Sequence, residues 1–309
     1  MQALPGRHNR EFFSIVSFRL AHLSDAHIGP LPDTHWRELL GKRFTGFINW
    51  QRRNTIHNMN VLAQIVADIR LNAPDHVAMT GDVMNIALPN EFTSARDWLK
   101  TLGEPVDVSF VPGNHDAYVR RVMDLIPRTF APWCSSDGDE VAHFPYLRVR
   151  GEVALIGLSS AIPTAPFLAS GNVGVLQMAK FAELLQETAA LGLCRVVMIH
   201  HPPWQGGASF GRGLRDASAF ERVIARHGAE LILHGHNHRL LNRKLTGPDG
   251  PVPCIGVASA SAVPGTPHHQ AAWHLFEIER KGNGWNIRGR GRGFRHDRPG
   301  LDDLEPIAL

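Results

Sequence analysis

The chain has 309 residues, of which 43% are hydrophobic and 20% charged, enough apolar material for one large α/β domain or two small ones. Its net charge of +3 is too small to indicate a nucleic-acid partner, and no run approaches the about 20 apolar residues that a membrane span requires. The three cysteines lie far apart without a CxxC motif, which indicates neither a disulfide framework nor a thiolate zinc site and favours a reducing cytoplasm.

The first predicted strand ends in a pair of ligand-type side chains. Residues 12–18 are too short and lack a cleavage site for a signal peptide, so we interpret them as an arm leading into this strand. The strand covers residues 18–23 and is followed by Asp25 and His27. Because residues two apart on an extended backbone point the same way, both side chains can reach one site.

Residues 31–53 form an insertion between this strand and the next helix. Its apolar residues recur near helical spacing, with arginines and lysines between them. Such a basic amphipathic segment, here 36–53, is typical of peripheral contact with an anionic membrane or of a cover over an apolar substrate. More often such a stripe packs on its own domain, and the sequence leaves both interpretations open.

Two further predicted strands also end in polar clusters. Asp82 follows one strand directly after Gly81, which taken alone is a common turn. Asn114, His115 and Asp116 follow the next strand in a polar run that is hard to explain as packing. The helices and strands that we predict in this part are, in order, 54–72, 76–80, 89–102 and 106–111.

The second half of the chain supplies three more histidines at strand ends. His200 follows a buried strand, and His236 and His238 follow another in the run Leu-His-Gly-His-Asn-His. Gly235 lets the backbone bend closely around a bound group. Residues 118–142 have no clear pattern. The predicted elements after them are a hairpin at 144–149 and 153–158, a helix at 175–191, a strand at 194–199, a helix at 217–227 and strands at 229–233, 240–245, 252–257, 273–279 and 285–288.

Two other segments of the second half are interpreted from their composition. The Gly-rich loop at 206–213 is suited to closing over a phosphate, with Arg212 and Arg215 as candidate substrate-binding residues, or it is a plain flexible connection. Residues 289–309, first rich in arginine and then acidic, are predicted to be a frayed tail. Since strands and helices alternate without repeats and antiparallel strands fill the last quarter, we predict a single α/β domain over 1–309.

Seven of the strand-end residues are suited to binding metal ions. They offer oxygen and imidazole ligands without sulfur, which suit Mn, Fe or Zn, and strand ends are where sites gather in open α/β sheets. Seven ligands exceed the need of one tetrahedral ion and suit two ions about 3.5–4 Å apart. Asp82, central in the order, is the candidate for a bridge between them. The seven are Asp25, His27, Asp82, Asn114, His200, His236 and His238.

The order of these blocks resembles the calcineurin-like metallophosphoesterases, and most of all their bacterial cyclic-nucleotide phosphodiesterase (class III) branch. The blocks are Asp-x-His, Gly-Asp, Gly-Asn-His-Asp, His and Gly-His-x-His, and they extend over residues 25–238. The resemblance implies a four-layer αββα sandwich. It implies that Asp82 bridges two ions, that His115 stays free of metal, and that Asp116 orients His115. The implied ligands are Asp25, His27 and His238 for the first ion and Asn114, His200 and His236 for the second.

The chemistry that we expect is metal-dependent hydrolysis of a phosphoric ester. Two dications lower the pKa of a bridging water to near neutral, so that hydroxide attacks phosphorus in line while a protonated His115 stabilises the departing alkoxide. The leading expectation is a phosphodiesterase acting on a cyclic nucleotide such as cAMP or another small phosphodiester. The alternatives are a phosphomonoesterase, a pyrophosphatase acting on a nucleotide-linked lipid precursor, and a non-catalytic scaffold. We expect a cytoplasmic protein, membrane-associated if 36–53 is interfacial, and the sequence leaves a homodimer open.

Overall fold

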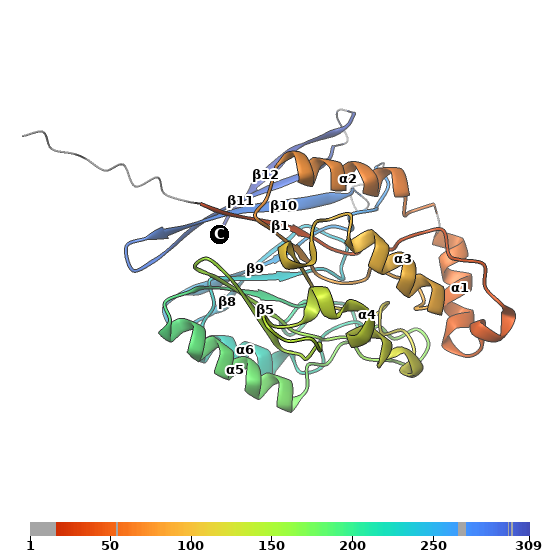
Figure 1. Ribbon diagram of the computed structural model, residues 1–309, viewed down its shortest axis with the longest axis horizontal. Coiled ribbons are helices and arrows are strands. Elements are labelled where there is room, and N and C mark those ends of the chain that lie inside the picture. The colour runs from red at the N-terminus through yellow and green to blue at the C-terminus, as the bar shows by residue number, and fades with distance from the viewer. Residues whose placement is uncertain (1–16, 54, 265–269, 296, 298) are drawn as a thin grey trace, which may run out of the picture.

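In the computed structural model, the chain folds into two six-stranded sheets with helices on their outer sides (Figure 1). This is the four-layer αββα sandwich that the sequence predicts. Residues 12–16 of the predicted N-terminal arm lie outside the described residues. The structure describes residues 17–53, 55–264, 270–295, 297 and 299–309.

The first sheet has the strand order β12-β11-β10-β1-β2-β3. Strands β1, β2 and β3 of this sheet are parallel, so their carboxyl ends lie on the same side of the sheet. The other three strands pair antiparallel. The bounds are β1 (Phe18–Leu23), β2 (His76–Met79), β3 (Val108–Phe110), β10 (Ala272–Lys281), β11 (Gly284–Phe294) and β12 (Leu301–Ile307).

The second sheet has the strand order β4-β5-β6-β7-β9-β8. Strands β5, β6, β7 and β9 are parallel, whereas β4 and β8 pair antiparallel at the two edges. Strands β5, β6 and β7 are short and mostly buried, as expected of parallel strands with both faces covered. The bounds are β4 (Tyr146–Arg150), β5 (Val153–Gly157), β6 (Cys194–Met198), β7 (Leu231–His234), β8 (Leu241–Thr246) and β9 (Pro251–Gly256).

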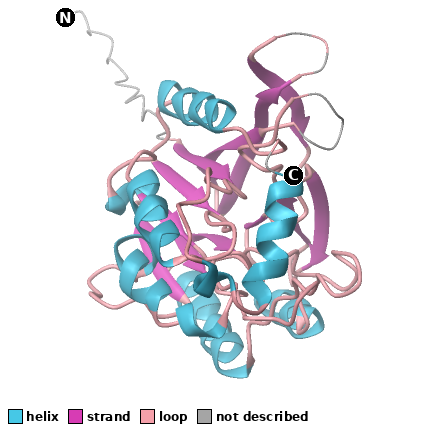
Figure 2. Cartoon of the chain, turned by 90° about the vertical axis from the view of Figure 1, so that its right-hand side faces the viewer, coloured by secondary structure: helices cyan, strands magenta, loops and turns pink. Residues whose placement is uncertain are grey.

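The helices cover the two sheets from outside. Helices α2 and α4 contact the first sheet, and α5 and α6 contact the second. In Figure 2, loops occupy the middle of the end that faces the viewer, and helices surround them. The bounds are α1 (Lys42–Arg53), α2 (Met59–Leu71), α3 (Pro89–Leu99), α4 (Leu125–Cys134), α5 (Val175–Ala190) and α6 (Ala217–His227), with short 3-10 helices η1 (Trp36–Leu39), η2 (Pro105–Asp107) and η3 (Arg120–Val122).

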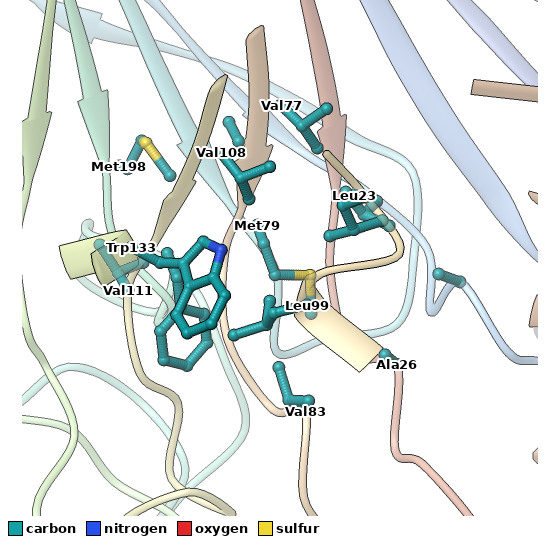
Figure 3. Close-up of a cluster of buried hydrophobic side chains, with 14 of the residues drawn as sticks. Leu23, Ala26, Val77, Met79, Val83, Leu99, Val108, Val111, Trp133 and Met198 are labelled. Carbon is teal, nitrogen blue, oxygen red and sulfur yellow. The ribbon is translucent and has the colours of Figure 1, made fainter. Parts of the chain in front are cut away.

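The largest hydrophobic core lies between the sheets and beneath α2, α3 and α4. In Figure 3, Met79 of β2 and Val108 of β3 lie with Trp133 of α4, and Met198 of β6 joins them from the second sheet. Burying each large apolar side chain contributes about 1.5–3 kcal/mol, so this cluster holds the two sheets in a fixed relation. That relation matters because the candidate ligands come from both sheets.

The C-terminal segment differs from the sequence-based prediction of a frayed tail over 289–309. Strand β11 continues to Phe294, and β12 pairs with it antiparallel. The physical reason is charge pairing, because the basic run of β11 faces acidic partners. The guanidinium of Arg292 donates two hydrogen bonds of 2.7 Å to the carboxylate of Asp68 in α2 and one of 2.8 Å to Asp303 in β12.

Two other segments contain helices whose bounds the sequence pattern did not define. The region 118–142, without a clear pattern in the sequence, contains η3 and α4. The insertion 31–53 forms η1 and α1. No helix in the described part of the chain combines the length and the apolar character needed to cross a membrane.

Candidate metal centre

The seven predicted ligand residues gather where strand ends of the two sheets meet. Hydrogen bonds between the loops continue beyond the strands, from Asp25 N–H to the Gly81 carbonyl (2.9 Å) and from His27 N–H to the Asp82 carbonyl (3.0 Å). In the second sheet, the Gly235 N–H donates to the His200 carbonyl at 3.1 Å. These bonds fix the loops that carry the ligand side chains.

The backbone at the site is held in an uncommon conformation. Of the eight described non-glycine residues with positive φ, five are predicted ligands: Asp25, His27, Asp82, His236 and His238. Such residues are infrequent and tend to cluster at functional sites. The sequence argument assumed an extended backbone for each His-x-His or Asp-x-His pair. The structure corrects this, because β1 ends at Leu23 and β7 at His234, and left-handed residues turn the side chains inward.

Gly235 is required by the close approach of the two sheets. A Cβ at this position would collide with Ser24 Oγ and the Asp25 carboxylate. The absence of a side chain allows His236 N–H to donate to Asp25 Oδ2 at 3.0 Å. One glycine therefore joins the loops after β1 and β7.

One group of ligand atoms forms around Asp25. The Nε2 atom of His238 lies 3.1 Å from Asp25 Oδ1 and 3.3 Å from Nε2 of His27. The His27 Nε2 atom lies 3.9 Å from the same carboxylate oxygen. Ligands that share one ion at bond lengths of about 2.0–2.2 Å stand about 3 Å apart, so the spacing fits a metal ion.

A second group forms around His200 Nε2. This atom lies 3.2 Å from Asp82 Oδ2, 3.3 Å from Asn114 Oδ1 and 3.3 Å from His236 Nδ1. The Asp82 carboxylate also lies within 4.8 Å of ring nitrogens of His27 and His115. Asp82 therefore stands between the two groups.

The hydrogen bonds of the imidazoles aim lone pairs into both groups. The Nδ1 atom of His27 faces the Met84 carbonyl at 3.2 Å, and Nδ1 of His200 faces the Thr80 carbonyl at 2.7 Å. Because a carbonyl only accepts, each Nδ1 carries a proton, and in the neutral ring the Nε2 lone pair is directed into the ligand group, where it can bind a metal ion. Histidine ligands of metals have this arrangement, so the residues fit divalent ions.

The electrostatics of the site favour positive charge. Asp25 and Asp82 are buried, and buried carboxylates need cationic partners or metal ions. Burial lowers the pKa of His200, but the neighbouring Asp82 outweighs it and raises that pKa to about 9. Burial raises the pKa of Asp82, yet His200 and His115 outweigh it and hold that pKa well below its usual range.

The neighbouring pair His115 and Asp116 differs from its predicted arrangement. The Asp116 carboxylate does not bond the imidazole; it accepts from the backbone N–H groups of Asp82, Val83, Met84 and Gly113 at 2.8–3.1 Å. The His115 Nδ1 instead bonds the Asn85 carbonyl. Asp116 thus shapes the loop that carries Asp82. Burial also lowers the pKa of His115, which opposes the expected protonated ring.

His201, next to His200, has a structural role. Its Nδ1 bonds Ser160 Oγ at 2.8 Å, and its Nε2 bonds the Ala169 carbonyl at 3.0 Å. Both ring nitrogens are therefore engaged away from the ligand groups.

A cavity of about 240 Å³ opens onto both ligand groups. Of the two candidate substrate-binding arginines, Arg212 lines it, whereas Arg215 is outside the lining and donates to Ser170 Oγ at 3.0 Å. Helix α1 and several loops form the opposite wall, which agrees with the expectation that 36–53 covers a substrate, but the lining residues themselves were not predicted. The missed lining residues include Lys42, Asn49, Trp50, His57, Tyr118 and Phe167.

Lys42 and His57 are the missed residues with the clearest chemistry. The Lys42 ammonium donates to Thr164 Oγ1 at 2.7 Å and lies 4.3 Å from the Tyr118 ring centroid. Burial lowers the pKa of Lys42 to about 8. His57, with His27 and His238, offers ring nitrogens that all lie within 4.8 Å of one another. In the sequence Lys42 was only one of several basic residues of the insertion, and His57 was isolated in a predicted helix.

Comparison with known proteins agrees with this geometry. The family model described as calcineurin-like phosphoesterase matches residues 18–240. A probable cyclic nucleotide phosphodiesterase from Synechococcus sp. is 26% identical over 72% of this chain and 78% of its own length. The glycerophosphodiester phosphodiesterase GpdQ from Enterobacter lignolyticus is 26% identical over 72% of this chain and 71% of its own length. A dimetal phosphatase structure from Danio rerio superposes with a TM-score of 0.55 at 15% identity, covering 89% of this chain and 95% of that chain.

Proposed function

Because the chain belongs to the calcineurin-like phosphoesterase family and is thus a metal-dependent phosphoester hydrolase, we propose that it holds two divalent ions and hydrolyses a small phosphodiester. The observation that carries the proposal is the position of Asp82 between the ligand group around Asp25 and the ligand group around His200, both beside one cavity. In the proposal, Asp82 would serve both ions, which would be Mn, Fe or Zn. The remaining ligands are Asp25, His27 and His238 for the first ion and Asn114, His200 and His236 for the second.

The protein residues around the cavity have separate tasks in this reaction. Two divalent ions supply a nucleophile at neutral pH and neutralise the non-bridging oxygens of the phosphate. His115, with Nδ1 fixed by the Asn85 carbonyl, would direct Nε2 toward the leaving oxygen, and in its protonated form it would give the Nε2 proton to the departing alkoxide. Lys42 and Arg212 bring positive charge to the same cavity and contact the anionic substrate.

A phosphodiester is favoured over a monoester by the opposite wall and by the relatives. A diester carries a second substituent, and the α1 wall offers Asn49 and Trp50 to contact it. The ring of Trp50 suits a flat group such as a nucleobase. Both curated relatives are named as phosphodiesterases. A cyclic nucleotide is therefore the first substrate to test.

The test compares substrates on protein that has been stripped of metal and reloaded with Mn²⁺, Zn²⁺ or Fe²⁺. We expect kcat/KM to be higher for bis(p-nitrophenyl) phosphate than for p-nitrophenyl phosphate, and cAMP to be hydrolysed among natural diesters. A phosphomonoester and a nucleotide-linked lipid diphosphate complete the panel. If the phosphomonoester or the lipid diphosphate is hydrolysed faster than every diester, the proposal is contradicted.

Peripheral contact with an anionic membrane through 36–53 is a second part of the proposal. Trp36, Leu40 and Phe44 are 63%, 61% and 57% exposed. The exposed Arg37 lies beside Trp36, whereas Arg43 is buried and donates to the Ile86 carbonyl. Phe47 packs partly against the core and Trp50 lines the cavity, so these two are less available to a membrane. An exposed apolar ridge with basic neighbours suits the interface of an anionic bilayer.

Flotation with vesicles tests the membrane contact. We expect binding to phosphatidylserine-containing vesicles and not to neutral ones, and loss of binding when Trp36, Leu40 and Phe44 are all replaced by Ser. Leu191→Ser, an exposed apolar residue at the end of α5, serves as the matched control. Equal recovery of the wild type and the triple variant with vesicles contradicts a membrane role of this ridge.

A further inference from the structure

His57 is placed beside the first ligand group by a connection between distant parts of the chain. The Asn58 N–H donates to the Ser261 carbonyl, and the Val263 N–H donates to the Ile56 carbonyl, each at 2.8 Å. His57 itself pairs with Ala262 as an isolated antiparallel bridge. The backbone on both sides of His57 is therefore fixed.

The segment that holds His57 is in turn fixed to the loop that carries Asp25. The Ser259 hydroxyl donates to the Asp25 carbonyl at 2.7 Å, and the Ala260 N–H donates to the Ser24 carbonyl at 2.9 Å. His57 and Asp25 thus share one support, although α1 and η1 separate them in sequence. A residue that only covered the cavity would not need to be fixed to the loop that carries Asp25.

The His57 side chain is also oriented. Its Nδ1 lies 2.8 Å from Ser261 Oγ, which sets the plane of the ring. Its ring centroid lies 4.5 Å from that of His27 and 5.8 Å from that of His238. One nitrogen from each of these rings lies within 4.8 Å of the other two. Three imidazoles that converge beside a buried carboxylate form a typical binding site for a transition metal.

We propose that His57 is an additional ligand of the first metal ion. The inference rests on the proposed dinuclear centre and specifies its first position. With His57, that ion has His27, His57 and His238 beside Asp25 and the shared Asp82, whereas the second has His200, His236, Asn114 and Asp82. Because imidazoles make up a larger share of its ligands, the first position favours Zn²⁺ or Fe²⁺ over Mn²⁺.

The test measures metal binding to chelator-treated protein by calorimetry with Zn²⁺ and by elemental analysis. We expect wild type to bind two ions. In His57→Ala and His57→Gln, we expect one dissociation constant to rise by about tenfold or more, since even residues that support a ligand cost about 10–100-fold, and the other to stay unchanged. Ser261→Ala should raise the same constant by less. His143→Ala, which removes an exposed imidazole, is the matched control.

The outcomes separate this inference from the proposed function. Failure of wild type to bind two ions overturns the dinuclear proposal and the inference that rests on it. Two wild-type sites whose constants stay unchanged in both His57 variants overturn the inference alone. A fall in kcat/KM with unchanged metal binding also overturns it, because His57 would then contact substrate. The visible absorption of Co²⁺-loaded protein should change in His57→Ala, which supports the inference without any assay of activity.

Discussion

Lys42 gives the cavity a cation whose charge depends on pH. Burial lowers its pKa to about 8, while the Asp82 carboxylate acts in the opposite direction. A lysine is charged below its pKa, so attraction for an anionic substrate is complete near pH 7 and is lost as pH rises through about 8. Bound cations would offset Asp82 and move this loss to a slightly lower pH. We therefore expect KM for a phosphodiester to rise on the order of tenfold above this pH.

The pH dependence of KM in Lys42 variants checks this prediction. Lys42→Met should show a high KM that no longer changes across this range, and Lys42→Arg should keep a low KM at high pH because a guanidinium stays charged. Tyr118, beneath the ammonium, does not titrate there, since burial raises its pKa to about 12. Lys100→Met, in an exposed position, is the control. An unchanged pH profile in Lys42→Met would show that another group is responsible.

His115 is expected to act on the substrate without holding a metal ion. Its contact with Asp82 uses the backbone N–H, at 2.7 Å, which an alanine retains. His115→Ala should therefore keep two bound ions and the same unfolding temperature while kcat falls by about 10²–10⁴-fold. Elemental analysis, thermal unfolding and steady-state kinetics on this variant provide the measurement. Wild-type turnover would refute the assignment, and loss of an ion would make His115 a ligand instead.

At the level of elements, the parts that sequence reasoning predicted are those with local signals. Each of the seven predicted ligands follows a short apolar strand, so its place at a sheet edge could be inferred without tertiary information. His57 could not, because its position depends on Ser261, 204 residues away. The strand β11 was partly missed for a different reason. Glycines alternate with arginines from Gly289 to Gly293, and both lack the β-branched or aromatic character of typical strands.

The pairing of α2 with β11 should make a measurable contribution to stability. Arg292 donates two hydrogen bonds to Asp68, and both side chains are largely buried, at 17% and 11% exposure. Arg292→Met leaves the carboxylate with the Trp273 indole as a remaining donor, so we expect the free energy of unfolding to fall by about 1–3 kcal/mol. Arg288→Met, which removes the two ion pairs of an exposed arginine on the same strand, should cost less than about 1 kcal/mol. Urea denaturation measures the free energy of unfolding of both variants. An equal decrease in the two would contradict a special role of Asp68.

At the level of the whole molecule, the candidate centre joins the two sheets. Asp25, Asp82 and Asn114 follow strands of the first sheet, and His200 and His236 follow strands of the second. Between the sheets, the apolar core already fixes their relation, as Met198 of β6 shows by its place among first-sheet residues (Figure 3). Ions bound across the junction would therefore add to a preformed fold and would not be needed to create it.

Metal removal tests this arrangement. Ions that bind only the folded state stabilise it by about 2.7–4.1 kcal/mol when their concentration is about 100–1,000 times their dissociation constant. We expect chelation to lower the unfolding temperature while circular dichroism at low temperature stays unchanged, and added Zn²⁺ or Mn²⁺ to restore it. The unfolding temperature of Asp82→Asn should change little with metal, because Asp82 lies between the two ligand groups. That of Asp97→Asn, at an exposed position of α3, should change as in wild type. Unfolding of the wild type on chelation alone would mean that the ions, and not the core, hold the sheets together. An unfolding temperature insensitive to metal would mean that the two groups do not bind ions.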